Sequence, residues 1–218
     1  MKTETIENYL KTIYNLSSDN SVLVTNKALS DKLELSPATV TEGLRKLHAL
    51  KYVIYEKSYG TRLTGSGAKM ALNIVRRHRI WETYLVKELG FGWDEVHEIA
   101  EELEHIKNDK LISKLSSILG NPVYDPHGDP IPDEKGKIPP SNFIRLSEGA
   151  AKNSYRIMGV TDHSPVFLKY LEKHQLLINT SLQLKAVEEF DASILLVCQK
   201  KEVLISAKVA EAIIVQIL

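Results

Sequence analysis

Histidine and glutamate side chains recur at helical spacing near the middle of the chain. The four residues are His97, Glu101, Glu104 and His105. Their spacing of i, i+4, i+7 and i+8 places all four along one stripe of a helix. Neighbouring carboxylates on such a stripe repel each other unless a cation lies between them. The stripe therefore predicts a cation-binding site.

A second pair of potential ligands precedes this stripe. His78 and Glu82 are separated by one helical turn. If the two helices pack antiparallel, the two groups together present six nitrogen and oxygen donors. Donor sets that are rich in oxygen and free of thiolates suit Mn²⁺ or Fe²⁺ better than Cu⁺ or a structural zinc. The expected cofactor is therefore Mn²⁺ or Fe²⁺.

The same stretch comes close to the His-Glu-x-x-His motif of zinc proteases. It begins with His97-Glu98, but Glu101 stands where the motif needs its second histidine. The two-histidine clamp is therefore not formed, and we predict no catalytic residue. A metalloenzyme or a metal store is a weaker alternative, because neither needs the basic N-terminal region of this chain.

That N-terminal region has the pattern of a DNA-reading element. Ser36-Pro37 combines an N-cap with proline at the first helical position and opens a helix that runs to about Leu50. A short helix over 28–33 precedes it, and a strand, turn and strand over 52–63 follow it, which is the outline of a winged helix-turn-helix. The predicted DNA contacts are Thr25, Ser36, Pro37, Ala38, Thr39, Thr41, Glu42, Arg45 and Lys46 in the helical part, and Lys57, Ser58, Tyr59 and Arg62 in the hairpin.

Charge is unevenly distributed, although the net charge is zero. Residues 1–80 hold 13 Lys and Arg against 7 Asp and Glu, and residues 81–120 hold 4 against 9. A basic N-terminal part suits a polyanion, and an acidic middle part suits cations. Within the basic part Glu42 is an exception, because its carboxylate would repel phosphate unless it reads cytosine.

Other helices follow from the periodicity of apolar residues. We expect helices over 6–16, from 64 to about 89, from 95 to about 106, and over 109–119. Residues 121–141 contain six of the eight prolines, so they form a linker or an irregular ordered loop.

Beyond this segment the apolar period becomes strand-like. Strands are expected over 154–160, 181–188, 193–199, 202–206 and 212–218, with a helix over 165–174. The predicted fold class is α+β. A winged helix-turn-helix domain would occupy residues 1–64, a helical domain residues 65–141, and a small β-barrel residues 142–218.

Composition limits the remaining possibilities. Cys198 is the only cysteine, so an internal disulfide and a cysteine-based zinc cage are excluded. No apolar run is long enough to cross a bilayer, and the N-terminus lacks the basic-then-apolar pattern of a secretory signal. We expect a cytoplasmic protein without a membrane partner.

The chain resembles the diphtheria toxin repressor family, which includes manganese-sensing regulators of metal uptake. The resemblance covers nearly the whole chain and rests on 7–14, 77–82, 96–105, 125–132 and the C-terminal β-domain. It implies a winged helix, a helical dimerisation and metal-binding domain, and an SH3-like barrel. It also implies a homodimer on a pseudo-palindromic operator in double-stranded DNA.

The resemblance further implies two metal sites in each chain. The primary site would combine Asn8 with Glu101, Glu104 and His105. The second site would combine His78, Glu82 and His97, completed by Asp125 or His127 and by Asp162 or His163.

Three residues depart from the family pattern. Iron-sensing members tend to carry Cys at the position of Glu101, so the harder oxygen ligand favours Mn²⁺ over Fe²⁺. Asn8 stands where the family usually has Asp or Met and offers only a neutral carbonyl oxygen, so Glu4 or Glu7 is an alternative ligand. Lys11 stands where some short manganese sensors have Glu, which argues against a closely spaced two-metal cluster.

The function expected from these residues is metal-dependent repression of metal-uptake genes. Metal would neutralise the acidic stripe and, through the first helix, tie the winged helix to the dimerisation domain. The alternative is a metal-independent winged-helix regulator that responds to another ligand. A chelator would abolish DNA binding in the first case and leave it unchanged in the second.

Overall fold

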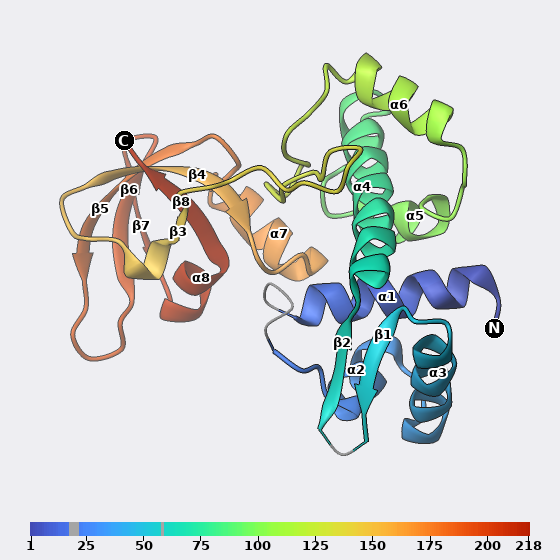
Figure 1. Ribbon diagram of the computed structural model, residues 1–218. Helices are drawn as coiled ribbons and strands as arrows, with labels where there is room; N and C mark the ends of the chain where they lie inside the picture. The colour runs from blue at the N-terminus through green and yellow to red at the C-terminus, as the bar shows by residue number, and fades with distance from the viewer. Residues whose placement is uncertain (18–21, 58) are drawn as a thin grey trace. The chain divides into compact units, whose positions relative to one another are not determined.

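The computed structural model describes residues 1–17, 22–57 and 59–218, so Ser58 of the predicted hairpin contacts lies outside the described residues. The chain forms two compact units (Figure 1). The first comprises residues 1–78, 101–112 and 132–138, and the second comprises residues 79–100, 113–131 and 139–218. Helices α4 (Gly65–Lys87), α5 (Val96–Leu103) and α6 (Asp109–Ile118) contribute residues to both units.

The first unit contains the predicted winged helix-turn-helix. Its elements are α1 (Thr3–Leu16), α2 (Asn26–Leu33), α3 (Pro37–Ala49), β1 (Val53–Glu56) and β2 (Gly60–Leu63). Thr25 and Ser36 cap α2 and α3, because their hydroxyl oxygens accept backbone N–H groups of the first turns. Pro37 occupies the first turn of α3, where its missing N–H costs nothing.

Helix α1 lies in the core of this unit. Tyr9, Leu10 and Ile13 are buried in one apolar cluster with Leu44 of α3. A β carbon on Gly43 would lie 2.7 Å from the Tyr9 ring, so only glycine allows this close approach.

The hairpin is fastened to the chain segment before α2. Strands β1 and β2 pair antiparallel from Val53↔Leu63 to Glu56↔Gly60. Val24 and Thr61 exchange backbone hydrogen bonds of 2.8 and 2.9 Å. The hairpin is therefore fixed relative to α2 and α3, which share its core.

The three middle helices differ from expectation at one end. Helix α5 ends at Leu103 rather than near Ile106, so Glu104 and His105 lie in the turn after it. In this turn Glu104 is hydrogen-bonded to Lys11 of α1 and His78 of α4. The Asn108 side-chain oxygen then caps the next helix by accepting the Leu111 N–H. None of the described helices is long and apolar enough to span a membrane.

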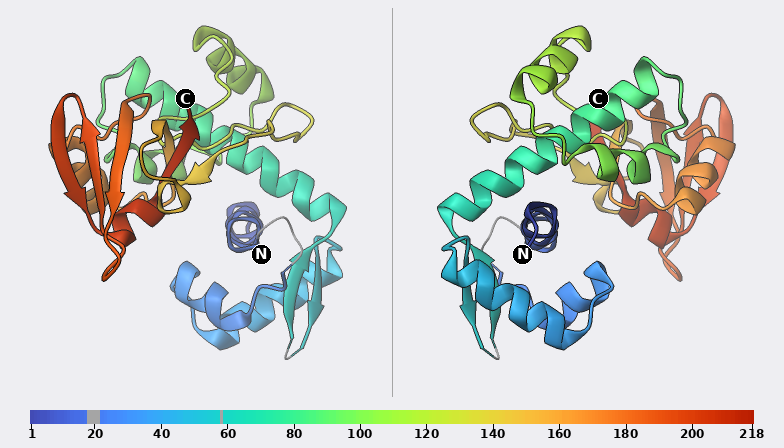
Figure 2. Two further views of the ribbon diagram at one scale, coloured as in Figure 1. Left: turned by 90° about the vertical axis from the view of Figure 1, so that its left-hand side faces the viewer. Right: turned by 90° about the vertical axis from the view of Figure 1, so that its right-hand side faces the viewer.

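The C-terminal part of the second unit, seen from two sides in Figure 2, contains β3 (Ile144–Arg145), η1 (Leu146–Glu148), β4 (Ser154–Val160), α7 (Pro165–Lys173), β5 (Ser181–Val187), β6 (Ile194–Cys198), β7 (Lys201–Ile205), α8 (Ala207–Ala212) and β8 (Ile213–Ile217). Its strands form a six-stranded antiparallel sheet in the order β3-β8-β4-β5-β6-β7. Register shifts in β4 and β5, between Ile157 and Gly159 and between Leu184 and Ala186, are irregularities of the kind that bend a sheet. The predicted small β-domain is therefore realised as an irregular sheet around one apolar core.

Part of the proline-rich segment is an ordered loop on β4. The backbone N–H of Val160 donates to the His127 carbonyl at 2.9 Å. Gly128 has φ +87°, and a β carbon there would lie 2.0 Å from the Met158 carbonyl oxygen. Only glycine tolerates both the positive φ and the close approach to the Met158 carbonyl oxygen. Gly128 therefore allows the loop to pack directly on β4. This contact places the side chains of residues 125–129 beside the second unit's candidate site.

Candidate metal centre

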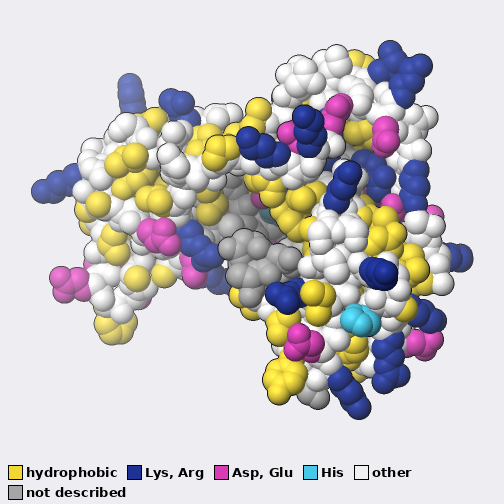
Figure 3. All heavy atoms as spheres, in the orientation of Figure 1, with side chains coloured by type: hydrophobic (Ala, Val, Ile, Leu, Met, Phe, Trp, Pro, Cys, Tyr) yellow, Lys and Arg dark blue, Asp and Glu magenta, His cyan; other side chains and the backbone are white. Residues whose placement is uncertain are grey.

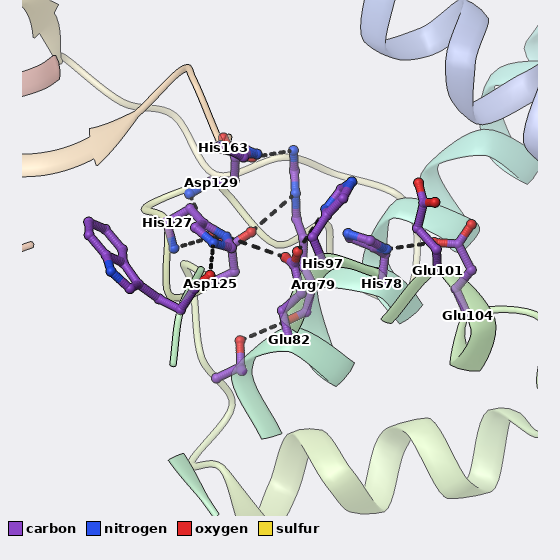
Figure 4. Close-up of polar contacts among 12 residues, drawn as sticks. His78, Arg79, Glu82, His97, Glu101, Glu104, Asp125, His127, Asp129 and His163 are labelled. Atoms are coloured by element: carbon purple, nitrogen blue, oxygen red, sulfur yellow. Dashed lines mark hydrogen bonds and ion pairs between the residues drawn. The ribbon is translucent and has the colours of Figure 1, made fainter. Parts of the chain in front are cut away.

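Three potential metal ligands from distant parts of the chain meet in the second unit. Glu82 comes from α4, and Asp125 and His127 come from the proline-rich loop (Figure 4). Ligand atoms of all three lie within 4.8 Å of one another. The residues are 2%, 6% and 1% exposed, so the group is almost completely withdrawn from water.

His127 is oriented as a metal-ligating histidine is. One ring nitrogen, Nε2, donates to the Trp93 carbonyl at 2.8 Å. This bond leaves Nδ1 pointing at the carboxylates, 3.6 Å from Glu82 Oε2 and 4.0 Å from Asp125 Oδ1. An outer hydrogen bond to a backbone carbonyl is the usual way in which a protein fixes the tautomer of a metal-binding imidazole.

Two buried polar atoms in this group make no hydrogen bond within the described part of the chain. They are Nδ1 of His127 and Oδ2 of Asp125. Buried polar atoms nearly always have a hydrogen-bond partner, and where they do not, a bound ion is one of the standard explanations. Ligands of one ion lie about 3–4 Å apart, because each is roughly 2 Å from the metal. The donor set therefore fits a divalent cation.

Further donors lie at the edge of this group. His97 Nδ1 is 3.2 Å from Glu82 Oε1, and its side chain is half exposed. The ring of His163 stacks on that of His127 at 4.7 Å, and its Nε2 is 3.7 Å from Asp129 Oδ2. These two histidines widen the possible ligand set beyond the buried three.

The structure separates the two candidates that follow β4. His163 faces the cluster, as described above. The Asp162 carboxylate instead accepts the Ser164 backbone N–H at 2.9 Å, just before α7. Of the two, His163 is therefore the better placed to contribute a ligand.

Sequence reasoning missed two members of this cluster, Arg79 and Asp129. The Arg79 guanidinium lies 3.6 Å from Asp125 Oδ2 and 3.3 Å from Asp129 Oδ2, and it also donates to the Pro130 carbonyl. It therefore holds the loop by three attachments. No spacing rule connects an arginine on a helix with a loop about 50 residues later. The one available signal is that Arg79 lies between the predicted ligands His78 and Glu82 in the sequence.

Burial and charge shift the protonation of the central residues. Burial, reinforced by the Asp129 and Glu82 carboxylates, raises the pKa of Asp125 to about 8. For His127, burial disfavours the charged ring, but the Glu82 carboxylate outweighs this effect and raises its pKa to about 9. Burial lowers the pKa of His163. A cation entering the group would thus meet ligands that bind protons at neutral pH.

The first unit holds a separate cluster around Glu104. Its carboxylate is bound by His78 Nδ1 at 2.7 Å and by Lys11 Nζ at 2.7 Å. Lys11 is also 3.4 Å from Glu101. Burial raises the pKa of Glu104, but the His78 hydrogen bond and the Lys11 charge outweigh it and hold that pKa below its ordinary value.

Glu7, rather than Asn8, completes this cluster. Asn8 is exposed, whereas Glu7 is buried and its Oε2 lies 2.8 Å from His105 Nδ1. Arg77 and Lys107 approach the same carboxylate at 3.0 and 3.3 Å. The predicted role of Asn8 as a ligand finds no support in this geometry, and Glu7, the alternative from sequence, takes its place in the cluster.

His78 belongs to this first-unit cluster through Glu104. It stands one turn before Glu82 on α4, as its spacing predicts, but Glu82 and His97 belong to the second unit. The predicted grouping of all three residues as one site stays a prediction.

The predicted DNA contacts form an exposed surface of the first unit. Every described candidate is exposed except Thr41, which is half-buried and donates to the Pro37 carbonyl. Figure 3 shows Lys and Arg side chains gathered over the end of this unit that carries α3 and the hairpin. Lys46 pairs with Glu42 at 2.7 Å and lowers its pKa, so the expected repulsion between Glu42 and phosphate is partly neutralised within the helix.

Comparisons with known proteins identify the family of this chain. Residues 1–61 match "Iron dependent repressor, N-terminal DNA binding domain", residues 64–133 match "Iron dependent repressor, metal binding and dimerisation domain", and residues 144–217 match the FeoA domain. A solved structure described as "Manganese-dependent transcriptional repressor complex with manganese" is 34% identical, has a TM-score of 0.88, and covers 98% of this chain and 100% of its own. The chain belongs to the iron-dependent repressor family. Members of this family are transcriptional regulators and not enzymes, so the prediction of a regulator without catalytic residues is confirmed.

Curated relatives match shorter stretches. The iron-dependent repressor IdeR of Mycobacterium leprae is 33% identical over 129 residues, which cover 59% of this chain and 56% of that protein. A probable metal transport system membrane protein of Chlamydia trachomatis is 49% identical over 75 residues, or 34% of this chain and 17% of that protein. The chain thus spans little more than half of the first relative and a small part of the second.

Proposed function

We propose that this chain is a Mn²⁺-dependent repressor that binds operator DNA as a homodimer in the cytoplasm. The observation that carries the proposal is the buried group of Glu82, Asp125 and His127, in a chain that also contains a winged helix-turn-helix. The proposed domain boundaries are those expected from sequence, at 1–64, 65–141 and 142–218.

The metal would be held by Glu82, Asp125 and His127, with His97 and His163 as further donors. When bound, a divalent cation supplies positive charge that neutralises the buried carboxylates. Arg79 keeps the loop in place, and Trp93 keeps the His127 ring turned toward the carboxylates. The chain thereby joins α4, the proline-rich loop and the end of β4 at one point.

Mn²⁺ is preferred over other ions because of the donors available. They are carboxylate oxygens and imidazole nitrogens, and the one cysteine, Cys198, is buried in β6. Such a set selects against thiolate-seeking ions and suits Mn²⁺ or Fe²⁺. Glu101, where iron-sensing relatives tend to carry Cys, and the similarity to a manganese-dependent repressor both favour Mn²⁺.

DNA would be read by the N-terminal end of α3 in the major groove, with the hairpin on the neighbouring phosphates. In a dimer the two α3 helices must lie about 34 Å apart to reach successive turns of the same groove. Metal that binds the DNA-competent arrangement more tightly raises DNA affinity, and DNA raises metal affinity by the same factor. The expected targets are metal-uptake genes.

The test is a titration of labelled promoter DNA from metal-transport genes with the full chain. It is done in chelator, in Mn²⁺ and in anaerobic Fe²⁺ at one salt concentration, because phosphate contacts make affinity salt-dependent. We expect tight binding only with metal, and tighter binding with Mn²⁺.

Two variants sharpen this test. His127→Ala should lose the metal response, whereas His174→Ala, which removes a histidine at the end of α7 that lies outside both clusters, should retain it. Equal binding in chelator and in metal would instead favour a regulator that responds to a different ligand.

A further inference from the structure

The first-unit cluster carries its own cations. Three carboxylates, those of Glu7, Glu101 and Glu104, face three cationic side chains, those of Lys11, Arg77 and Lys107. Leaving the two histidines aside, the formal charges of this group cancel. The cluster is therefore compensated before any metal arrives.

Lys11 forms ion pairs with two carboxylates of this cluster. Its Nζ lies 2.7 Å from Glu104 and 3.4 Å from Glu101, which are the two carboxylates of the predicted stripe. Glu104 is 0% exposed and Lys11 is 9% exposed, so water screens this pair little. A divalent ion would have to displace the ammonium group or leave uncompensated positive charge in a buried site, which is strongly unfavourable.

We infer that Lys11 competes with divalent metal for the Glu101–Glu104 pair and thereby sets the metal affinity of the first-unit cluster. This inference rests on the proposed function only in assuming that metal is present. In the metal-free chain the ammonium group ties α1 to the end of α5. Metal enters this cluster only at concentrations that also displace Lys11 from the two carboxylates.

The neighbouring residue does not offset this competition. Asn8 is exposed and carries no charge, so it adds no carboxylate to the cluster. Glu7 is already paired with Arg77, Lys107 and His105.

The test measures Mn²⁺ bound to the full chain from the paramagnetic resonance signal of free Mn²⁺. His127→Ala serves as the background, so that the first-unit cluster is observed alone. Lys11→Met removes the charge at similar volume, and Lys11→Arg is the matched control that keeps it. We expect Lys11→Met to bind Mn²⁺ at least tenfold more tightly than the background, and Lys11→Arg to resemble the background. Unchanged or weaker binding in Lys11→Met would overturn the inference.

Thermal unfolding supplies a second readout. Lys11→Met leaves Glu104 buried without its cation, so its metal-free Tm should fall by several degrees. Mn²⁺ should raise the Tm of Lys11→Met more than that of the background, because tighter binding to the folded state stabilises it more. If Lys11 had a purely structural role, Lys11→Met would lower the metal-free Tm, but Mn²⁺ would raise the Tm of Lys11→Met no more than that of the background. If Lys11→Met does not fold, Lys11→Gln, which keeps a hydrogen-bond donor, is tested against the same expectations.

The two proposals fail in different ways. If the proposed function is wrong, the wild-type chain binds operator equally in chelator and in Mn²⁺, whatever the Lys11 variants do. If the inference about Lys11 is wrong, wild-type operator binding still depends on metal, and Lys11→Met gains no Mn²⁺ affinity.

Discussion

At the scale of residues, hydrogen bonds decide which donors of this chain are available to a metal. His127 Nε2 donates a hydrogen bond to a backbone carbonyl, which leaves Nδ1 facing Glu82 and Asp125. His105 and His78 present their Nδ1 atoms to carboxylates that already have cationic partners. The same residue type therefore has different roles in the two units.

Trp93 should report on metal binding directly. Its ring stacks on His127 with centroids 6.1 Å apart and planes at 15°. In a Trp81→Phe chain Trp93 is the only tryptophan, and we expect paramagnetic Mn²⁺ to quench its fluorescence in a saturable way. His127→Ala should weaken binding by more than the roughly 10- to 100-fold typical of losing an outer partner of a ligand. An unquenched Trp93 in a chain that demonstrably binds Mn²⁺ would place the metal elsewhere.

Metal binding should depend on pH in a definite direction. At pH 7 the metal-free chain holds a proton on Asp125, with a pKa of about 8, and on His127, with a pKa of about 9. Ligation needs a carboxylate and a neutral imidazole, so binding releases protons. Affinity should rise with pH by roughly tenfold per unit for each proton released and level off above about pH 9.

Calorimetry in buffers of different ionisation enthalpy measures this proton release. The expected result at pH 7 is a heat of binding that varies with the buffer. In Asp125→Asn the variation should shrink, because one titrating ligand is gone. A heat that is independent of the buffer would contradict the assignment of these two ligands.

At the scale of elements, the metal centre depends on a loop that fits closely onto a strand. Residues 125–129 are irregular in structure, yet they are held by β4, by Arg79 and by their own turn hydrogen bonds. A proline-rich segment suits this role, because its restricted backbone loses little conformational freedom on folding.

Gly128→Ala tests this arrangement. The substitution combines a positive φ with a β carbon 2.0 Å from Met158 O, so the loop must move away from β4. We expect a loss of roughly 1–3 kcal/mol in the free energy of unfolding and a large loss of metal affinity. Gly120→Ala is the matched control, because φ is +75° there and nothing lies within 4 Å of the added carbon. Equal metal affinity in both variants would show that the contact with β4 is not needed.

In the molecule as a whole, the basic residues expected to contact DNA and the acidic residues expected to bind metal lie in different environments. The basic residues of α2, α3 and the hairpin lie on the exposed surface, while the carboxylates of the metal clusters are largely buried and paired. Zero net charge therefore conceals a surface suited to DNA.

The salt dependence of operator binding should reflect this surface. Arg62→Gln on the hairpin should weaken binding to operator and to unrelated DNA by similar factors and lower the slope of log affinity against log salt by about one. Arg156→Gln on β4 removes an arginine of the C-terminal sheet that is also exposed, and it should leave the slope unchanged. An effect of Arg62→Gln on the operator alone would indicate base reading rather than phosphate contact.

Local sequence was sufficient for most elements of the fold. Caps at Thr25 and Ser36 and a change of apolar period near residue 150 predict the helices and the five longer strands to within a few residues. The strand Ile144–Arg145 and the helix Ala207–Ala212 were missed, because two residues show no period and six residues fill less than two helical turns.

The ligands themselves show what only the tertiary structure could decide. The sequence identified which residue types could bind a metal and which of them lie one helical turn apart. It could not decide which of two adjacent residues faces a cluster, as with Glu7 and Asn8 or with Asp162 and His163. Adjacent residues point in different directions, and which one faces a partner depends on packing between segments far apart in the chain. The same reason applies to Lys11. Its spacing in the sequence relates Lys11 only to other residues of α1. It becomes the partner of Glu104, 93 residues later in the chain, because the fold brings α1 against that segment.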